Sequence, residues 1–251
     1  ATLRPPTSTP GCVAWSAEVA DGAGGFPVSL DDGWIEAGLA EEFPELRLAT
    51  AGVDCVPGKS SPGLRQQLGE LREKNPKAQL KHEWVPYERI SVNLKKAVVA
   101  SEDSGFVEHG GVDWEALEKA YERNNRRSKV VGGGSTITQQ LAKNLFLSGS
   151  RSYVRKGQEL VIAFMLETVM SKERILELYL NVVEFGRGVF GAEAAARYYY
   201  KTSAANLTQA QAARLAVMLP NPRYYDKHRS TNYLERRTNA ILRQMRFAEV
   251  P

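Results

Sequence analysis

The sequence predicts a mainly α-helical fold over residues 81–251, preceded by a small, incomplete-looking α+β segment over residues 1–80. From Trp84 onward, apolar residues recur at helical spacing between short Gly, Asn and Ser turns. The charge divides at the same place: residues 1–80 hold 7 basic and 11 acidic side chains (net −4), and residues 81–251 hold 26 and 18 (net +8). We therefore predict two unlike parts that meet near residues 75–83.

The first 80 residues carry turn signals and little periodicity. Residues 1–33 are rich in Pro, Gly, Ser and Asp, which predicts loops with one short strand. A strand-like piece follows at 46–56 and a polar helix at 61–74. Cys12 and Cys55 lack metal-ligand spacing, so a disulfide and two free thiols stay open as alternatives.

The second part contains several segments with local helix signals. Thr208 and Gln211 form a capping-box pattern before an apolar helix that stops at Pro220, and Ser135 or Thr136 can cap another helix. The predicted helices, in chain order, begin near Asn93 and end at Gly105, follow Asp113, follow Thr136, span 155–170, follow Thr208, and run through 234–245.

The predicted helix over residues 155–170 contains L-V-I-A-F-M-L, which is apolar on all sides. This pattern predicts burial at the centre of a helix bundle. No apolar run approaches the roughly 18 to 20 residues that span a bilayer, so we expect no transmembrane anchor in this sequence. With 43% hydrophobic and 25% charged residues, the composition is that of an ordinary globular protein.

Residues 100–111, A-S-E-D-S-G-F-V-E-H-G-G, hold three carboxylates and one histidine. Glu102 lies four residues after Val98 and so continues an apolar stripe, whereas Asp103 projects about 100° away. A carboxylate at the rim of an apolar face tends to have a raised pKa and accepts a proton more readily. A structural, capping or ion-paired role is the alternative for Glu102, and a structural role is the alternative for His109.

Residues 130–144 form a glycine loop that runs into a helix start, which suits an anion. The loop lacks the Gly-Lys-Ser/Thr of a nucleotide P-loop. Residues 119–156 contain nine basic side chains and one acid, Glu122. Arg and Lys side chains beside such a loop suit a pyrophosphate. A plain glycine hinge and a solvated basic face are the alternatives.

Glu159 stands where the apolar run begins, in R-K-G-Q-E. An acid at such a position is either buried in an ion pair or functional. Two separated carboxylates and a basic phosphate pocket are ingredients of glycosyl chemistry. Spacing alone does not bring Glu102 and Glu159 together.

Taken together, these motifs resemble the peptidoglycan glycosyltransferases of family 51, especially the monofunctional biosynthetic transglycosylases. They are also similar to the N-terminal catalytic domains of class A penicillin-binding proteins. The matching stretches run in order from about Trp84 to Phe247: E-D-S-G-F-V-E-H-G-G (102–111), G-G-S-T-I-T-Q-Q-L-A-K-N (133–144), R-K-G-Q-E (155–159), K-E-R-I-L-E-L-Y-L-N (172–181), F-G-R-G-V-F-G-A-E-A-A-A (185–196) and A-A-R-L-A-V-M-L-P-N-P (212–222).

The resemblance implies a lysozyme-like helical domain with a second, membrane-proximal lobe, and a reaction that polymerises lipid II. Glu102 would be the general base that deprotonates the acceptor 4-hydroxyl. The attack would invert the donor sugar to a β-1,4 bond and expel undecaprenyl pyrophosphate. Glu159 would be the second catalytic acid and would orient the donor phosphates directly or through a divalent metal.

The resemblance also assigns residues around these two acids. Lys143 and Arg151, with Arg155 and Lys156 nearby, would neutralise the leaving pyrophosphate. Other residues would line the cleft or bind substrate, namely Asp103, Ser135, Thr136, Gln139, Gln140 and Asn144. A third group would shape the motifs: Phe106, His109, Gly111 and Asn181.

By the same resemblance we expect Mg²⁺ or another divalent cation near Glu159 and no organic cofactor. The expected partners are lipid II, the lipid-linked glycan strand, the bacterial membrane surface and other cell-wall synthesis or division proteins, but not nucleic acid. The catalytic domain would act at the periplasmic face of the inner membrane.

Two other function classes stay open at this point. A lytic or hydrolytic lysozyme-like muramidase would release soluble muropeptides, although the basic cluster beside the S-T-I-T-Q-Q loop favours a pyrophosphate donor. A non-catalytic basic module that binds nucleic acid or anionic membrane fits the pI near 9.0. It would bind in a salt-sensitive way that does not depend on Glu102 or Glu159.

Overall fold

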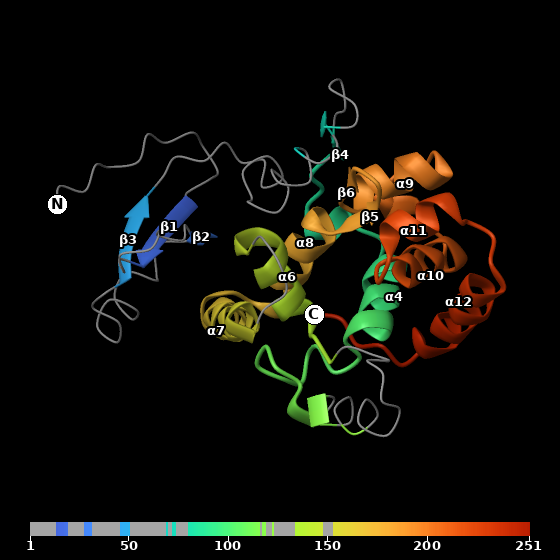
Figure 1. Ribbon diagram of the computed structural model, residues 1–251. Coiled ribbons are helices and arrows are strands. Elements are labelled where there is room, and N and C mark those ends of the chain that lie inside the picture. The colour runs from blue at the N-terminus through green and yellow to red at the C-terminus, as the bar shows by residue number, and fades with distance from the viewer. Residues whose placement is uncertain are drawn as a thin grey trace.

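The structure is a computed structural model (Figure 1). It describes residues 14–19, 28–31, 46–50, 69, 72–73, 80–115, 117–118, 122, 134–147 and 153–251. The predicted site residue Arg151 and both cysteines lie outside the described residues. From residue 80 onward the described chain is mostly helical, which confirms the predicted mainly α fold.

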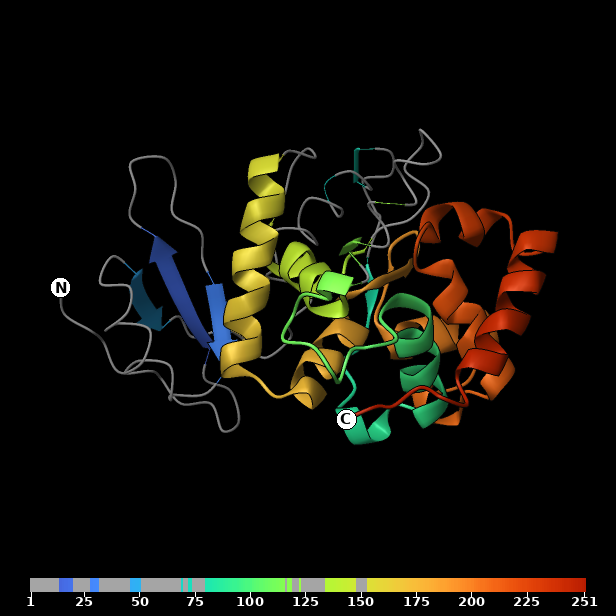
Figure 2. The same ribbon diagram turned by 90° about the horizontal axis from the view of Figure 1, so that it is seen from below.

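Packed helices form the core of the second part. Helix α4 (Val92–Glu102) packs on α10 (Gln209–Met218) and α12 (Asn232–Gln244), and α6 (Ile137–Phe146) packs on α8 (Lys172–Val182). Figures 1 and 2 show these helices in a row that runs from α6 through α8 and α4 to α12. Their facing sides share one apolar core, whose fully buried side chains include Leu94, Phe106, Leu141, Ile175 and Tyr179.

Hydroxyl side chains mark where these helices begin. A cap of this kind satisfies a backbone N–H that the first turn leaves without a partner. Thr208 and Gln211 form the predicted capping box of α10. Helix α4 ends at Glu102, earlier than the predicted end at Gly105, because Asp103 leaves helical geometry (φ −161°). The other hydroxyl caps are Ser91 for α4, Thr136 for α6, Ser171 for α8 and Thr231 for α12.

Helix α7 (Tyr153–Val169) corrects a prediction. It packs on α6 and α8 at one end of the helical row and not at its centre (Figure 2). Ala163 and Leu166 are buried, but Val161 and Phe164 are 62% and 66% exposed. An apolar composition all round a helix does not show which of its sides pack against other helices. The prediction of a central helix was therefore wrong.

The described residues also include smaller elements that complete this part. Asn181, at the end of α8, is buried and holds the segment before α4: its Oδ1 accepts from Val85 N (2.9 Å) and its Nδ2 donates to Val85 O (2.8 Å). Gly191 has φ +82°, and a Cβ there would lie 2.6 Å from the Asn181 carbonyl oxygen, so this close approach requires glycine. The elements are β4 (Lys81–His82), η1 (Tyr87–Arg89), β5 (Glu184–Gly186), β6 (Val189–Phe190), α9 (Ala192–Tyr200), η2 (Ala204–Asn206) and α11 (Pro222–Lys227), with strand order β4-β6-β5.

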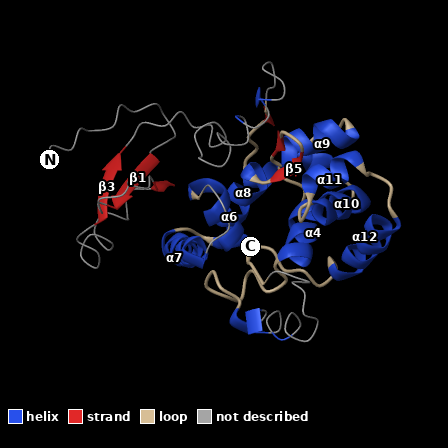
Figure 3. Cartoon of the chain, viewed as in Figure 1, coloured by secondary structure: helices blue, strands red, loops and turns tan. Residues whose placement is uncertain are grey.

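The N-terminal segment holds a separate antiparallel sheet (Figure 3). Its strands β1 (Ala14–Val19), β2 (Val28–Asp31) and β3 (Leu46–Thr50) follow the order β2-β1-β3. The strand-like piece predicted from residue 46 is confirmed, but residues 1–33 contain two strands where one was predicted. The alternation of Trp, Ala and Val with Ser and Glu across β1 was the signal that could have found it.

Candidate active site

Glu102 is the last residue of α4, and its carboxylate accepts two hydrogen bonds. Gln140 Nε2, from α6, donates to Oε2 (3.1 Å), and Ser101 Oγ donates to Oε1 (3.3 Å). Burial raises the pKa of the Glu102 carboxyl, while the bonds from Gln140 and Ser101 and the charge of Arg237 oppose that rise. A carboxylate in such surroundings is well suited to accept a proton.

The Gln140 side chain has a second hydrogen-bond partner. The Tyr179 hydroxyl, on α8, donates to Gln140 Oε1 at 3.0 Å. The Tyr179 side chain is fully buried, and burial raises its pKa well above the ordinary value, so the hydroxyl keeps its proton. Three elements thus meet in one chain of hydrogen bonds that ends on Glu102.

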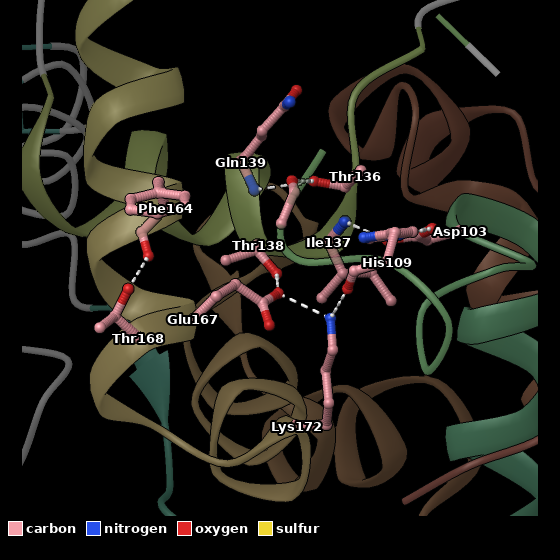
Figure 4. A network of polar contacts seen from close by, with 11 residues as sticks. Asp103, His109, Thr136, Ile137, Thr138, Gln139, Phe164, Glu167, Thr168 and Lys172 are labelled. Atoms are coloured by element: carbon pink, nitrogen blue, oxygen red, sulfur yellow. Dashed lines mark hydrogen bonds and ion pairs between the residues drawn. The ribbon is translucent and has the colours of Figure 1, made fainter. Parts of the chain in front are cut away.

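Asp103 joins the end of α4 to the start of α6. His109 Nε2–H donates to Asp103 Oδ1 (2.8 Å), and the backbone N–H of Ile137 donates to Oδ2 (2.9 Å), as Figure 4 shows. The Asp103 side chain is only 3% exposed. The resemblance placed Asp103 among the substrate-binding residues, but its surroundings are those of a scaffold, because both oxygens already have protein partners.

The turn that follows Asp103 is fixed by Lys172, at the start of α8. Lys172 Nζ donates to the carbonyl of His109 (2.6 Å) and to Glu167 Oε1 (2.8 Å), and it lies 4.6 Å from the centre of the buried Phe106 ring. Glu167, near the end of α7, also accepts from Thr138 Oγ1 on α6 (2.5 Å; Figure 4). This network ties α6, α7 and α8 to the turn.

The turn closes at Gly111, which has φ +86°. Thr136 Oγ1 donates to the Gly111 carbonyl at 2.6 Å and also caps α6 through Gln139 N. A Cβ on Gly111 would lie 3.0 Å from Glu167 Cγ and 3.2 Å from the Ala163 carbonyl oxygen. Both the backbone angle and the close approach of α7 therefore require glycine here.

A second cluster lies where α6 and α7 meet, centred on Lys156. Lys156 Nζ donates to Ser135 Oγ (3.1 Å), Gln139 Oε1 (3.2 Å) and Glu159 Oε2 (2.9 Å). Arg155 Nη1 pairs with the other Glu159 oxygen at 3.0 Å. Two cations around one buried acid leave this cluster, which we call the cationic corner, with one excess positive charge.

Helix α6 connects the cationic corner to Glu102. The neighbouring side chains Gln139 and Gln140 bond to Lys156 and Glu102 respectively. Lys143, one turn further along α6, is exposed, and Asn144 is half-buried. Helix α6 therefore links Glu102, on α4, with Lys156, on α7.

The donor set at Glu159 does not fit a directly bound divalent cation, because both of its oxygens are paired with cations. Within the described ranges, Asp103, His109 and Asp113 place one ligand atom each within 4.8 Å of one another. Both Asp103 oxygens are already bonded, so this trio also belongs to the scaffold. We assign no reaction step to a metal ion, and the expected need for Mg²⁺ stays a prediction.

Comparison with known proteins shows the family to which this chain belongs. The family described as Transglycosylase matches residues 67–246. The chain belongs to the transglycosylase family. It is 72% identical over 188 residues to a biosynthetic peptidoglycan transglycosylase of Herminiimonas arsenicoxydans, which covers 75% of this chain and 81% of the relative.

Other relatives carry the same name. That of Janthinobacterium sp. (strain Marseille) is 69% identical over 199 residues, covering 79% of this chain and 86% of the relative. That of Bordetella pertussis (strain Tohama I) is 66% identical over 196 residues, covering 76% and 81%. The expected family and the expected enzyme class, a glycosyltransferase-type transglycosylase, are thereby confirmed.

Several residues of this transglycosylase site were missed by sequence reasoning. Tyr179 and Lys172 lie inside the stretch 172–181, which was matched as a motif without roles for these side chains. Glu167 is an acid within an apolar run, so the reasoning that singled out Glu159 could have found it. Arg237, whose charge acts on Glu102 from α12, offers no local signal, because its place depends on how α12 packs.

Proposed function

We propose that this chain polymerises lipid II into β-1,4-linked glycan strands and releases undecaprenyl pyrophosphate, with inversion at the donor carbon and Glu102 as the general base. The observation that supports it best is the half-buried Glu102 carboxylate, which is held by Gln140 of α6 while the neighbouring Gln139 reaches the cationic corner. The assignment to peptidoglycan synthesis rests on the names of the relatives.

In the proposed reaction, Glu102 takes the proton of the 4-hydroxyl of the acceptor N-acetylglucosamine. The freed oxygen forms a bond to C1 of the donor N-acetylmuramic acid as the bond from C1 to the pyrophosphate oxygen breaks. General-base catalysis of this kind contributes about 10²- to 10⁴-fold. The desolvated surroundings that raise the pKa of Glu102 favour the transfer.

The cationic corner would receive the negative charge that develops on the leaving pyrophosphate. Lys156 and Arg155 are held in place by Glu159 before substrate arrives, so little reorganisation is needed. Lys143 and Arg151 complete the set by motif position. Glu159 would act by orienting Arg155 and Lys156. Ser135 and Gln139, which also bond to Lys156, hold its ammonium group in place. Asn144 would line the cleft.

Exposed apolar side chains support a position at the membrane surface. Val154, Val161 and Phe164 of α7 are 75%, 62% and 66% exposed, and Trp114 is 69% exposed. The three α7 residues share one side of the helix by their spacing, and exposed apolar surface of this kind suits a lipid interface. No helix of the described chain is long and apolar enough to cross a bilayer. We place the catalytic domain at the periplasmic face of the bacterial inner membrane.

Labelled lipid II tests the proposal. The chain should convert it to long glycan products, and Glu102→Gln should lower the rate by about 10²-fold or more while the protein stays folded. Glu108→Gln is the matched control, because Glu108 is an exposed acid of the same stretch. The proposal fails if wild-type chain makes no polymer, or if Glu102→Gln polymerises as fast as wild type. Release of soluble muropeptides from finished glycan would instead identify a muramidase.

A further inference from the structure

Tyr179 is close to the proposed base but cannot reach substrate. Its side chain has no exposed surface, and its hydroxyl donates to Gln140 Oε1 at 3.0 Å. A fully buried hydroxyl cannot contact substrate, so its most direct route to the chemistry is the side chain that it hydrogen-bonds. Gln140, half-buried on α6, is in direct contact with Glu102.

The amide of Gln140 has two unlike ends, and this makes its orientation matter. An ionised carboxylate only accepts hydrogen bonds, whereas an amide carries one accepting oxygen and one donating nitrogen. With Oε1 bound by the Tyr179 hydroxyl, the Nε2–H₂ group points to Glu102 Oε2 (3.1 Å). A reversed amide would set oxygen against oxygen.

We propose that Tyr179 is a positioning residue for the reaction: it fixes the Gln140 amide so that its N–H₂ group holds the ionised Glu102 carboxylate in place. This inference rests on the proposed role of Glu102 as the base. It assigns to Tyr179 a task beyond packing the core.

The direction of the effect follows from the groups that face Glu102. Burial and the neighbouring Asp103 raise the pKa of Glu102, while the bonds from Gln140 and Ser101 and the charge of Arg237 lower it. Loss of the Gln140 bond removes one of the lowering contributions. A base works only when ionised, so the acidic limb of the pH profile should then move to higher pH.

The experiment measures kcat/KM for lipid II against pH for wild type, Tyr179→Phe, Gln140→Met and the double variant. Both single variants should move the acidic limb upward by about one pH unit, the scale of one hydrogen bond to a charged group. The double variant should match Gln140→Met, because Tyr179 acts through Gln140 and the two losses are not additive.

Tyr199→Phe is the matched control. Its hydroxyl lies within hydrogen-bond distance of two acceptors, Asp226 Oδ1 (3.0 Å) and the Phe185 carbonyl oxygen (3.1 Å), and neither of them is bonded to Glu102. Both Tyr→Phe variants should lower the melting temperature, but Tyr199→Phe should leave the acidic limb where it is. A merely structural role for Tyr179 would make the two variants alike.

Each outcome decides the matter. An unmoved limb in Gln140→Met overturns the proposal even if Tyr179→Phe does not fold. A Tyr179→Phe loss that adds in full to that of Gln140→Met also overturns it. Failure of the proposed function looks different, since Glu102→Gln would then keep its activity and the limb would not report Glu102 at all.

Discussion

Lys156→Met tests the cationic corner most directly. The Lys156 ammonium makes three contacts within 3.2 Å, to Ser135, Gln139 and Glu159. Its removal leaves Arg155 and Glu159 as a neutral pair at 3.0 Å. The corner would then lose its excess positive charge while most of its apolar packing stays in place, because methionine keeps a side chain of similar length.

The size of the effect follows from charge and exposure. A cation about 4 Å from a phosphate oxygen gains about 4 kcal/mol at an effective dielectric near 20. The Lys156 side chain is 40% exposed, so water screens part of this attraction. We therefore take half of this interaction energy, about 2 kcal/mol. Its loss should lower kcat/KM about 30-fold. Since the leaving pyrophosphate gains charge in the transition state, most of the loss should fall on kcat.

Initial rates of lipid II polymerisation, measured at several substrate concentrations, separate kcat from KM. Lys227→Met is the matched control, because Lys227 is an exposed cation on α11 away from the corner, and its rates should stay within about 2-fold of wild type. A Lys156→Met chain that folds normally and keeps kcat/KM within about 3-fold of wild type would refute the assigned role of this charge.

Three further perturbations test the scaffold and the apolar side of α7. Lys172→Met leaves the His109 carbonyl and Glu167 without their cation, so the melting temperature should fall by about 6 °C, equivalent to about 2 kcal/mol. Gly111→Ala forces a side chain into a left-handed backbone against α7 and should cost about 2 to 3 kcal/mol in a denaturant melt, whereas Gly110→Ala, where a Cβ meets nothing within 4 Å, should be nearly neutral. Val161→Ser with Phe164→Ser should weaken sedimentation with anionic lipid vesicles without lowering the melting temperature, and unchanged binding would contradict the membrane-facing assignment of α7.

Local patterns in the sequence were enough to place most helices. The cap at Thr136 and the capping box at Thr208 depend on side chains that bond within three residues, so the amino-acid order alone predicts them. The partners of Glu102 could not be predicted in the same way. Gln140 and Tyr179 lie 38 and 77 positions further along the chain, and only the packing of α4, α6 and α8 brings them together.

The misplacement of α7 has a different cause. Its composition is that of a buried helix, but burial in protein and contact with another apolar phase leave the same pattern in a sequence. Glu159 and Glu167 were the local signs that only one side of α7 packs against other helices. Both acids face the neighbouring helices, whereas Val161 and Phe164 face outward.

The two sides of α7 also have a mechanical consequence. At about 100° and 1.5 Å per residue, Val161 lies about 200° around the helix from Glu159 and only about 3 Å along it. In the proposed function, α7 therefore carries Glu159, which orients the pyrophosphate-binding cations, on one side and the membrane-facing side chains on the other. The helix would then set the height above the lipid at which a pyrophosphate is held, so a one-residue insertion between Glu159 and Val161 should misplace one side relative to the other without changing any side chain.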